Sequence, residues 1–303
     1  MMDQTFKKRR NPEDGYELWL RYEPIVPGPI LTEYRAALTQ IVIGTLSATL
    51  EAAREELTLA LERMLETSIP ILEQIEQDGT LIIGTPHSSA LVAEVHLQEE
   101  LLEAGDEGFV IIRQPVRDRD CIVIAGNTDV GVLYGVFHFL RHLQTHQPLH
   151  FLSVISAPKI KHRLLNHWDN LDRTVERGYA GFSLWDWHKL PDYLSPQYKD
   201  YARANASIGI NGTVLTNVNA NALILTRQYL IKVAALADVF RPYGIRVYLT
   251  ARFSAPIEIG GLKTADPLDS AVIAWWNTKA AEIYEFIPDF GGFVVKANSE
   301  GQP

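Results

Sequence analysis

Reactive side chains stand close together near the end of the 303-residue sequence. The apolar run 291–295 leads into Lys296, Asn298 and Glu300, and Pro303 is the last residue. An apolar run that ends in ionisable residues is typical of a buried strand whose side chains reach the open end of a barrel, where barrel enzymes hold their reactive groups. The carboxyl group of Glu300 is therefore a candidate proton donor, and the sequence stops soon after it.

Polar residues also follow three earlier apolar runs in the second half of the sequence. Asn166 to Asp169 follow the first run, Thr216 to Asn219 the second, and Arg252 the third. The carboxyl ends of parallel strands meet on one rim of a (β/α)8 barrel. We therefore expect these residues to lie near Lys296 and Glu300. The position of Arg252 fits an ion pair of the scaffold and a contact to substrate equally well.

The elements that must position these residues alternate regularly from residue 151 to residue 303. Strands followed by helices predict a parallel sheet with right-handed crossovers. The strands are expected at 161–166, 212–218, 245–253 and 292–297, and the helices at 196–207, 227–240 and 268–286. A complete barrel takes about 250 residues. The pattern therefore predicts about four strands, the first half of a (β/α)8 TIM barrel that is truncated after Pro303.

Residues 1–150 predict a separate N-terminal α/β domain. Its strands are expected at 16–22, 80–84, 108–113 and 120–125, with the last two forming a pair, and its helices at 47–67 and 127–144. Asn127 or Thr128 can cap the second helix, because both side chains accept hydrogen bonds from free backbone N–H groups.

Composition excludes several classes of protein. Apolar residues make up 47% of the chain and charged residues 21%, which is too apolar for a disordered chain. The net charge of −9 argues against a nucleic-acid partner, which needs a basic face. No apolar run approaches the ~20 residues of a membrane helix. The charged stretch 1–15 has no apolar core like that of a secretory signal, so a cytoplasmic protein is expected.

No metal or cofactor is expected. His138, His142 and His146 recur every four residues on one helix, a spacing that can bind zinc. Because no glutamate stands where a zinc protease would need it, we interpret these histidines as a surface or interdomain face of the helix. The single cysteine, Cys121, lies in an expected strand and is interpreted as a buried, unreactive thiol.

Two long motifs resemble the α-glucuronidases of glycoside hydrolase family 67. The segment 166–172, continued by 175–181 and 183–185, is similar to that family's first barrel loop, and 296–303 is similar to its fourth-strand motif. Segments 205–212 and 216–220 also fit, and the first domain is similar to the family's N-terminal domain, which β-hexosaminidases share in outline. The resemblance covers essentially the whole chain.

The resemblance implies an inverting hydrolase of the xylan-degrading class. These enzymes release (4-O-methyl-)D-glucuronic acid from the non-reducing end of xylo-oligosaccharides. Residue by residue, it implies that Glu300 is the general acid, that Lys296 contacts the glucuronate, that Trp168 is an aromatic at the sugar site and that Val218 shapes the pocket. Asn298 lies in the same motif as Lys296 and is a further binding candidate.

The family's base carboxylates lie on later strands than this chain contains. The resemblance therefore implies half of an active site and an inactive fragment. A full-length protein is expected to form a homodimer through a C-terminal region that this chain lacks.

Each candidate residue has a structural alternative. Glu300 can be a solvated loop residue. Lys296 can form a salt bridge to a neighbouring strand, and Trp168 can pack in the core. Asp169 and Asp172 resemble a catalytic pair, but their place in a long loop favours hydrogen bonds that stabilise the loop.

Two other functions remain open. The first is a non-catalytic truncated product that at best binds sugar or partners. The second, weaker alternative is another barrel glycosidase; a hexosaminidase would typically carry an Asp-Glu pair where Ser299-Glu300 stands.

Overall fold

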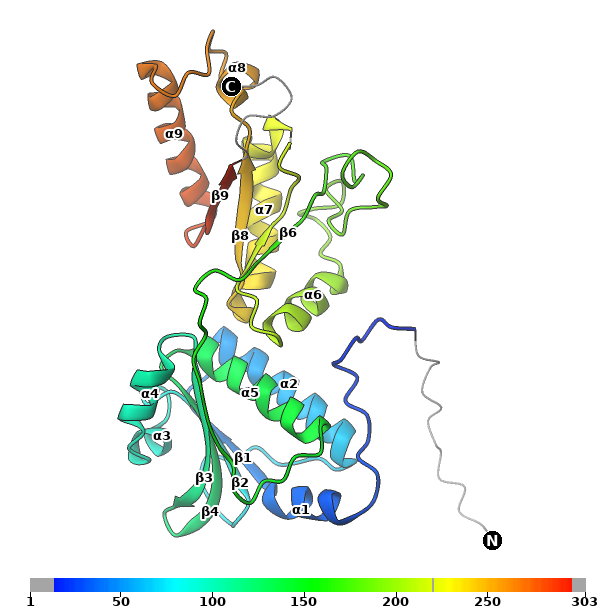
Figure 1. Ribbon diagram of the computed structural model, residues 1–303, viewed down its shortest axis with the longest axis vertical. Helices are drawn as coiled ribbons and strands as arrows, with labels where there is room; N and C mark the ends of the chain where they lie inside the picture. Colours follow the sequence, from blue (N-terminus) through cyan, green and yellow to red (C-terminus); the bar gives the residue numbers. More distant parts are fainter. Residues whose placement is uncertain (1–13, 220, 296–303) are drawn as a thin grey trace.

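A computed structural model describes residues 14–219 and 221–295 (Figure 1). Three of the six candidate site residues, Trp168, Val218 and Arg252, fall within these ranges. Lys296, Asn298 and Glu300, together with the end of the strand expected at 292–297, lie outside the described residues.

The first sheet contains five strands in the order β1-β2-β4-β3-β5. They are β1 (Gln40–Ile43), β2 (Thr80–Gly84), β3 (Phe109–Val116), β4 (Arg119–Gly126) and β5 (Ser153–Ser156). β1, β2 and β4 are parallel, whereas β3 is antiparallel to both β4 and β5. The expected strand 80–84 and the expected strand pair are confirmed; β1 and β5 were not predicted.

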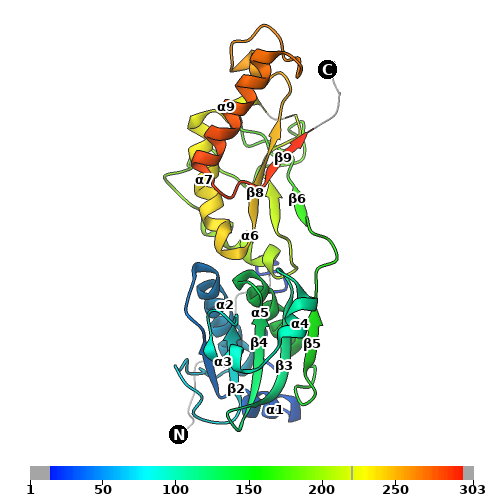
Figure 2. The ribbon, with the colours of Figure 1, turned by 90° about the vertical axis from the view of Figure 1, so that its left-hand side faces the viewer.

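Helices cover both faces of this sheet (Figures 1 and 2). One face carries α2 (Ala48–Leu65) and α5 (Asp129–Gln144), and the other carries α3 (Ala90–Glu94) and α4 (Gln98–Ala104). Successive side chains of β2 point to opposite faces of the sheet. Leu81 therefore packs in one apolar cluster and Ile82 in the other. The expected helices are confirmed, and Thr128 rather than Asn127 caps α5.

The strand expected at 16–22 is wrong. Residues 15–19 form turns, and Leu18 and Tyr22 have φ angles of 51° and 49°. A pleated strand excludes such angles. The alternating apolar residues attach this segment to the domain instead: Leu20 and Tyr22 are buried, while Leu18 is half exposed. We call residues 15–20 the N-terminal arm; it leads to α1 (Pro29–Ala37).

The second sheet is parallel and has the order β6-β7-β8-β9. Its strands are β6 (Leu164–Asn166), β7 (Gly212–Val214), β8 (Arg246–Ala251) and β9 (Gly292–Val295). The three long helices are α6 (Pro196–Ala206), α7 (Arg227–Phe240) and α9 (Ser270–Phe286); shorter turns are α8 (Ala255–Glu258), η1 (Ala222–Leu225) and η2 (Arg241–Tyr243). Four strands are present as predicted, although β6 and β7 are shorter than expected. Within the described residues the sheet is open.

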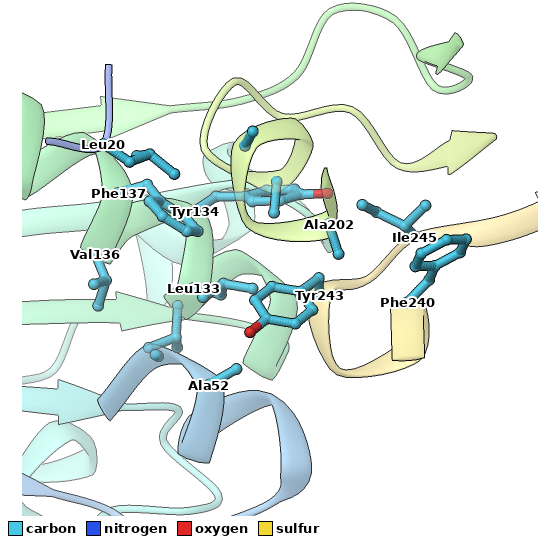
Figure 3. Packing of buried hydrophobic residues seen from close by; sticks show 14 of the residues in the cluster. Leu20, Ala52, Leu133, Tyr134, Val136, Phe137, Ala202, Phe240, Tyr243 and Ile245 are labelled. Atoms are coloured by element: carbon cyan, nitrogen blue, oxygen red, sulfur yellow. The ribbon is translucent and has the colours of Figure 1, made fainter. Parts of the chain in front are cut away.

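The connection between the two sheets lies after residue 156. A division at residue 150 would assign β5 to the second part, whereas β5 completes the first sheet by pairing with β3. One apolar cluster continues across the junction, and Figure 3 shows Leu133 of α5 near Tyr243 and Phe240 of the second part. The two parts therefore share buried contacts.

Buried charges also join the two parts. The Arg203 guanidinium of α6 donates to both carboxylate oxygens of Glu56 on α2, at 2.7 and 3.0 Å. Glu56 is 3% exposed and accepts a third hydrogen bond from the Tyr22 hydroxyl. A second ion pair connects Arg163 with Glu107. In the part of the chain that the structure describes, no helix is long and apolar enough to cross a membrane.

Candidate functional site

The carboxyl ends of the second sheet's strands lie at the end of the sheet away from the first domain (Figure 1). We call this end the rim. It is formed by the loop 167–195 after β6, residues 215–219 after β7, and residues 252–254 after β8. The sequence-predicted residues Trp168, Val218 and Arg252 each belong to one of these segments.

Trp168 is held at the rim by its neighbour His167. The His167 backbone N–H donates to the Val214 carbonyl at 3.0 Å, which continues the pairing of β6 with β7. The His167 ring packs edge-on against Trp185, and its Nε2 lies 2.8 Å from the Tyr201 hydroxyl. Trp168 itself is 39% exposed. The core-packing alternative for Trp168 is therefore wrong, while its contact with a sugar stays a prediction.

The two aspartates of the first loop stabilise that loop, as the structural alternative predicted. Asp169 is buried and accepts hydrogen bonds from the Ser183 hydroxyl at 2.5 Å and the Leu184 N–H at 3.1 Å. Asp172 accepts from the hydroxyl and N–H of Thr174, and these hydrogen bonds lower the pKa of Asp172. Both carboxylates therefore hold the loop by hydrogen bonds.

Hydrogen bonds between neighbouring strands fix the position of Val218. The Thr250 hydroxyl donates to the Asn217 carbonyl at 2.9 Å and lies 2.8 Å from the Thr216 hydroxyl. The Asn217 backbone N–H donates to the Asp169 carbonyl at 2.8 Å. Residues from β6, β7 and β8 are thereby connected, and the partly buried Val218 follows directly.

Arg252 forms the ion pair that was one of its two predicted roles. Its Nε lies 2.8 Å from Glu258 Oε1 and 3.0 Å from the Ser254 hydroxyl, so the start of α8 anchors one edge of the guanidinium. Within residues 14–219 and 221–295, all of the side-chain hydrogen bonds and ion pairs of Arg252 involve Nε. Among the described residues, neither Nη group has a hydrogen-bond partner, and the side chain is 39% exposed.

Sequence reasoning missed the polar residues that support the rim from inside. Tyr201 of α6 bridges His167 and the Thr213 hydroxyl, which lies 2.9 Å from the Tyr201 hydroxyl. Burial raises the pKa of Tyr201, so its hydroxyl stays protonated. The available signal was a polar residue inside an apolar strand: Thr213 and Thr250 are buried in β7 and β8.

The helix histidines and the single cysteine, for which the sequence predicts no chemistry, make contacts within the first domain. His138 packs against Phe109, and burial lowers the pKa of its imidazole. His142 Nε2 lies 3.1 Å from the Pro148 carbonyl. Among the described residues, no group of three His, Cys, Asp or Glu side chains is placed to hold a metal ion. Cys121 is buried in β4, and burial raises the pKa of its thiol.

Two solved structures have a fold similar to that of this chain. The structure of CpGH84B has a TM-score of 0.53 at 13% identity, and the match covers 86% of this chain and 40% of that one. A GH138 enzyme targeting pectin rhamnogalacturonan II has a TM-score of 0.54 at 15% identity over 84% of this chain and 30% of that one. At these identities the likeness concerns the fold alone.

Sequence comparison gives a closer relation. Alpha-glucuronidase A of Emericella nidulans is 36% identical, and a probable alpha-glucuronidase A of Aspergillus terreus is 37% identical, each over 96% of this chain. The chain spans only 34% of the length of either relative. Residues 18–139 match the model of the glycosyl hydrolase family 67 N-terminus, and residues 142–303 match that of the family's middle domain. The chain therefore belongs to glycoside hydrolase family 67.

Proposed function

We propose that the complete protein is an inverting α-glucuronidase and that this chain supplies the first part of its active site. The substrate would be a xylo-oligosaccharide that carries (4-O-methyl-)D-glucuronic acid on its non-reducing end. The observation that carries the proposal is the family relation over both domains, with curated relatives named alpha-glucuronidase A. The rim supports it, because Trp168, Val218 and Arg252 each lie on one of the segments that follow three neighbouring parallel strands.

The rim suits an anionic sugar. A carboxylate binds most strongly to a guanidinium that offers two parallel N–H donors. Arg252 has its Nε occupied by Glu258 and Ser254, so the Nη side of the guanidinium is presented in a fixed orientation. Trp168 would cover an apolar face of the sugar ring, and Val218 would limit the space beside it. Lys296 and Asn298, outside the described residues, would add a cation and an amide.

Inversion requires two carboxyl groups about 6.5–9.5 Å apart. One protonates the leaving oxygen, and the other removes a proton from a water molecule on the opposite face of the sugar. Glu300 is the proposed acid. Among the described carboxylates, Asp169 and Asp172 of the rim accept hydrogen bonds, Asp186 of the same loop pairs with Arg173, and Glu258 of α8 pairs with Arg252. The base would come from a later strand of the complete protein, as the family resemblance implies.

The first prediction is that the 303-residue chain alone does not hydrolyse its proposed substrate. Positioned acid and base groups each contribute about 10²–10⁴-fold to the rate, so loss of the base should remove most of the acceleration. The purified chain would be incubated with aldouronic acids, and released 4-O-methylglucuronate would be measured. A full-length family member provides the positive control. Turnover comparable with that control would contradict the half-site proposal.

Retained binding would separate an enzyme fragment from an unrelated product. We expect the chain to bind D-glucuronate, and we expect Trp168→Ala and Arg252→Ala to weaken this binding. Arg241→Ala is the matched control, because Arg241 is also a partly exposed, ion-paired arginine but pairs with Asp238 and Asp289, away from the rim. Equal effects of the two arginine variants would contradict a specific role for Arg252. The homodimer and the cytoplasmic location stay predictions.

A further inference from the structure

A pocket lies between the N-terminal arm and α6, and Leu184 of the loop 167–195 also reaches its lining, whereas Trp168, Val218 and Arg252 do not. Its volume is about 430 Å³, and its lining includes Tyr16, Trp19, Gln197, Asp200 and Asn205. The arm supplies one wall and α6 the other. We call this space the arm pocket.

Two aromatic side chains remain exposed at the arm pocket although the arm is firmly attached. Tyr16 is 51% exposed and Trp19 is 47% exposed. The Tyr16 hydroxyl donates to Asp200 at 2.8 Å, and the Trp19 indole N–H donates to the Ser207 hydroxyl at 2.7 Å. Leu18 between them has a φ of 51°, a conformation that is costly for a leucine. Two aromatic rings that hydrogen bonds hold at one pocket offer a fixed apolar surface on which a ligand can pack.

The charged groups of the arm pocket already have partners. Asp200 pairs with Arg203 at 2.8 Å, and Arg203 also pairs with Glu56. Glu17 of the arm pairs with Arg63 at 2.7 Å. A charged ligand would have to compete with these ion pairs, whereas a neutral ligand would not. The charge balance therefore favours an uncharged occupant.

Two amides offer the remaining hydrogen bonds. Asn205 lines the pocket, and its Nδ2 donates to the Tyr201 carbonyl at 2.8 Å, while its Oδ1 accepts no hydrogen bond from the described residues. Among the described residues, the Gln197 side-chain amide has no hydrogen-bond partner, and Gln197 is exposed. An amide both donates and accepts, as a sugar hydroxyl does. Aromatic rings beside a few fixed polar groups are the usual composition of a small-molecule site.

We propose that the arm pocket binds a neutral oligosaccharide, at a second site distinct from the rim. The C–H faces of pyranose rings would pack on Tyr16 and Trp19, and the hydroxyls would bond to Gln197 and Asn205. This site does not depend on the proposed hydrolysis, because none of its lining residues belongs to the rim candidates. An unsubstituted xylo-oligosaccharide is the probe of choice, since it lacks the carboxylate that the rim is proposed to recognise.

The test is calorimetric titration of the full chain with xylotriose. Removing a well-packed aromatic ring typically costs enough affinity for a change of about tenfold or more. Trp19→Ala should therefore weaken xylotriose binding at least about tenfold, and Gln197→Ala should weaken it less. Tyr284→Ala is the matched control, because Tyr284 on α9 is also 51% exposed but lies outside the pocket. Thermal unfolding of each variant would show that it is folded.

The xylotriose titration tests the arm pocket, and its outcome does not depend on the test of the rim. If Trp168→Ala rather than Trp19→Ala abolished xylotriose binding, the sugar would bind at the rim and the arm-pocket proposal would fall. Absence of xylotriose binding to the full chain would also overturn it. Self-association of the chain that Trp19→Ala disrupts would assign the arm pocket to a second copy instead, against the proposal. The D-glucuronate titration tests the rim separately, so its failure would leave the arm pocket untouched.

Discussion

Ion-paired residues buried at the junction between the two parts contribute more to the free energy of unfolding than ion pairs at the surface. Glu56 is almost completely buried and accepts hydrogen bonds from Tyr22 and Arg203, each between 2.6 and 3.0 Å. Removing one partner of a buried ion pair leaves the other charge without compensation, and the cost is about 3–5 kcal/mol. An exposed pair contributes only about 0–1 kcal/mol. The position of a charge, rather than its type, therefore determines its importance here.

Glu56→Gln should destabilise the chain by about 1–3 kcal/mol, because a buried charge-assisted hydrogen bond is lost while Arg203 keeps Asp200 as a partner. The substitution keeps the size of the side chain but removes one of the two negative charges that Arg203 pairs with. Urea unfolding would measure the change. Glu51→Gln on the same helix is the matched control, because Glu51 pairs with Arg54 at a site where both side chains are more than one third exposed. Equal destabilisation by the two substitutions would show that burial of Glu56 does not matter.

The proposed acid can also be tested at this scale, in the full-length protein. Glu300→Gln keeps the shape of the side chain but removes its proton. For a xylose leaving group kcat should fall by about 10²–10⁴-fold, because that oxygen needs protonation in the transition state. A nitrophenolate leaves without a proton, so its rate should fall much less. Lys296→Ala should lower kcat/KM for both substrates alike. An equal loss for both substrates in Glu300→Gln would exclude Glu300 as the acid.

At the scale of elements, the sequence predicts best where local pattern and tertiary environment agree. The helix 227–240 was predicted to the residue, because its apolar spacing matches a helix packed on a buried sheet. The arm was misread, because alternation at 16–22 cannot show that a partner strand is missing. The short helices α3 and α4 were missed. The rim could be located from polar residues after apolar runs, but the bridge from Tyr201 to His167 depends on contacts far apart in the sequence.

Gly108 shows how tightly these elements are joined. A Cβ at this position would lie 2.0 Å from the Ala104 carbonyl oxygen of α4 and 2.4 Å from the Ser156 carbonyl oxygen of β5. Because both obstacles are backbone atoms, Gly108→Ala should force a shift and destabilise the chain by about 1–3 kcal/mol. Gly28→Ala, where the nearest atom is 3.9 Å away, is the control and should change stability little. A neutral Gly108→Ala in thermal unfolding would contradict the described packing.

At the scale of the whole molecule, each sheet has two edge strands as its margins, β1 and β5 in the first sheet and β6 and β9 in the second. Within the described residues these margins have no neighbouring strand, although both sheets share one apolar cluster at the junction. The second sheet is therefore attached to the first domain at one end, and its two edge strands are unpaired on their outer sides within the described residues. Exposed strand margins are known sites of self-association.

The last prediction is that the isolated chain self-associates through its open sheet. Val295 ends the described part of β9 and is 53% exposed. A lysine on an edge strand opposes pairing with another chain, because its charge would have to be desolvated. Val295→Lys should raise the monomer fraction in size-exclusion chromatography with light scattering, without lowering the melting temperature. Leu268→Lys is the control, because Leu268 is 85% exposed but lies in the loop before α9. If both lysines dispersed the chain equally, added charge alone would explain the effect; a chain that is monomeric at high concentration before any substitution would contradict the prediction.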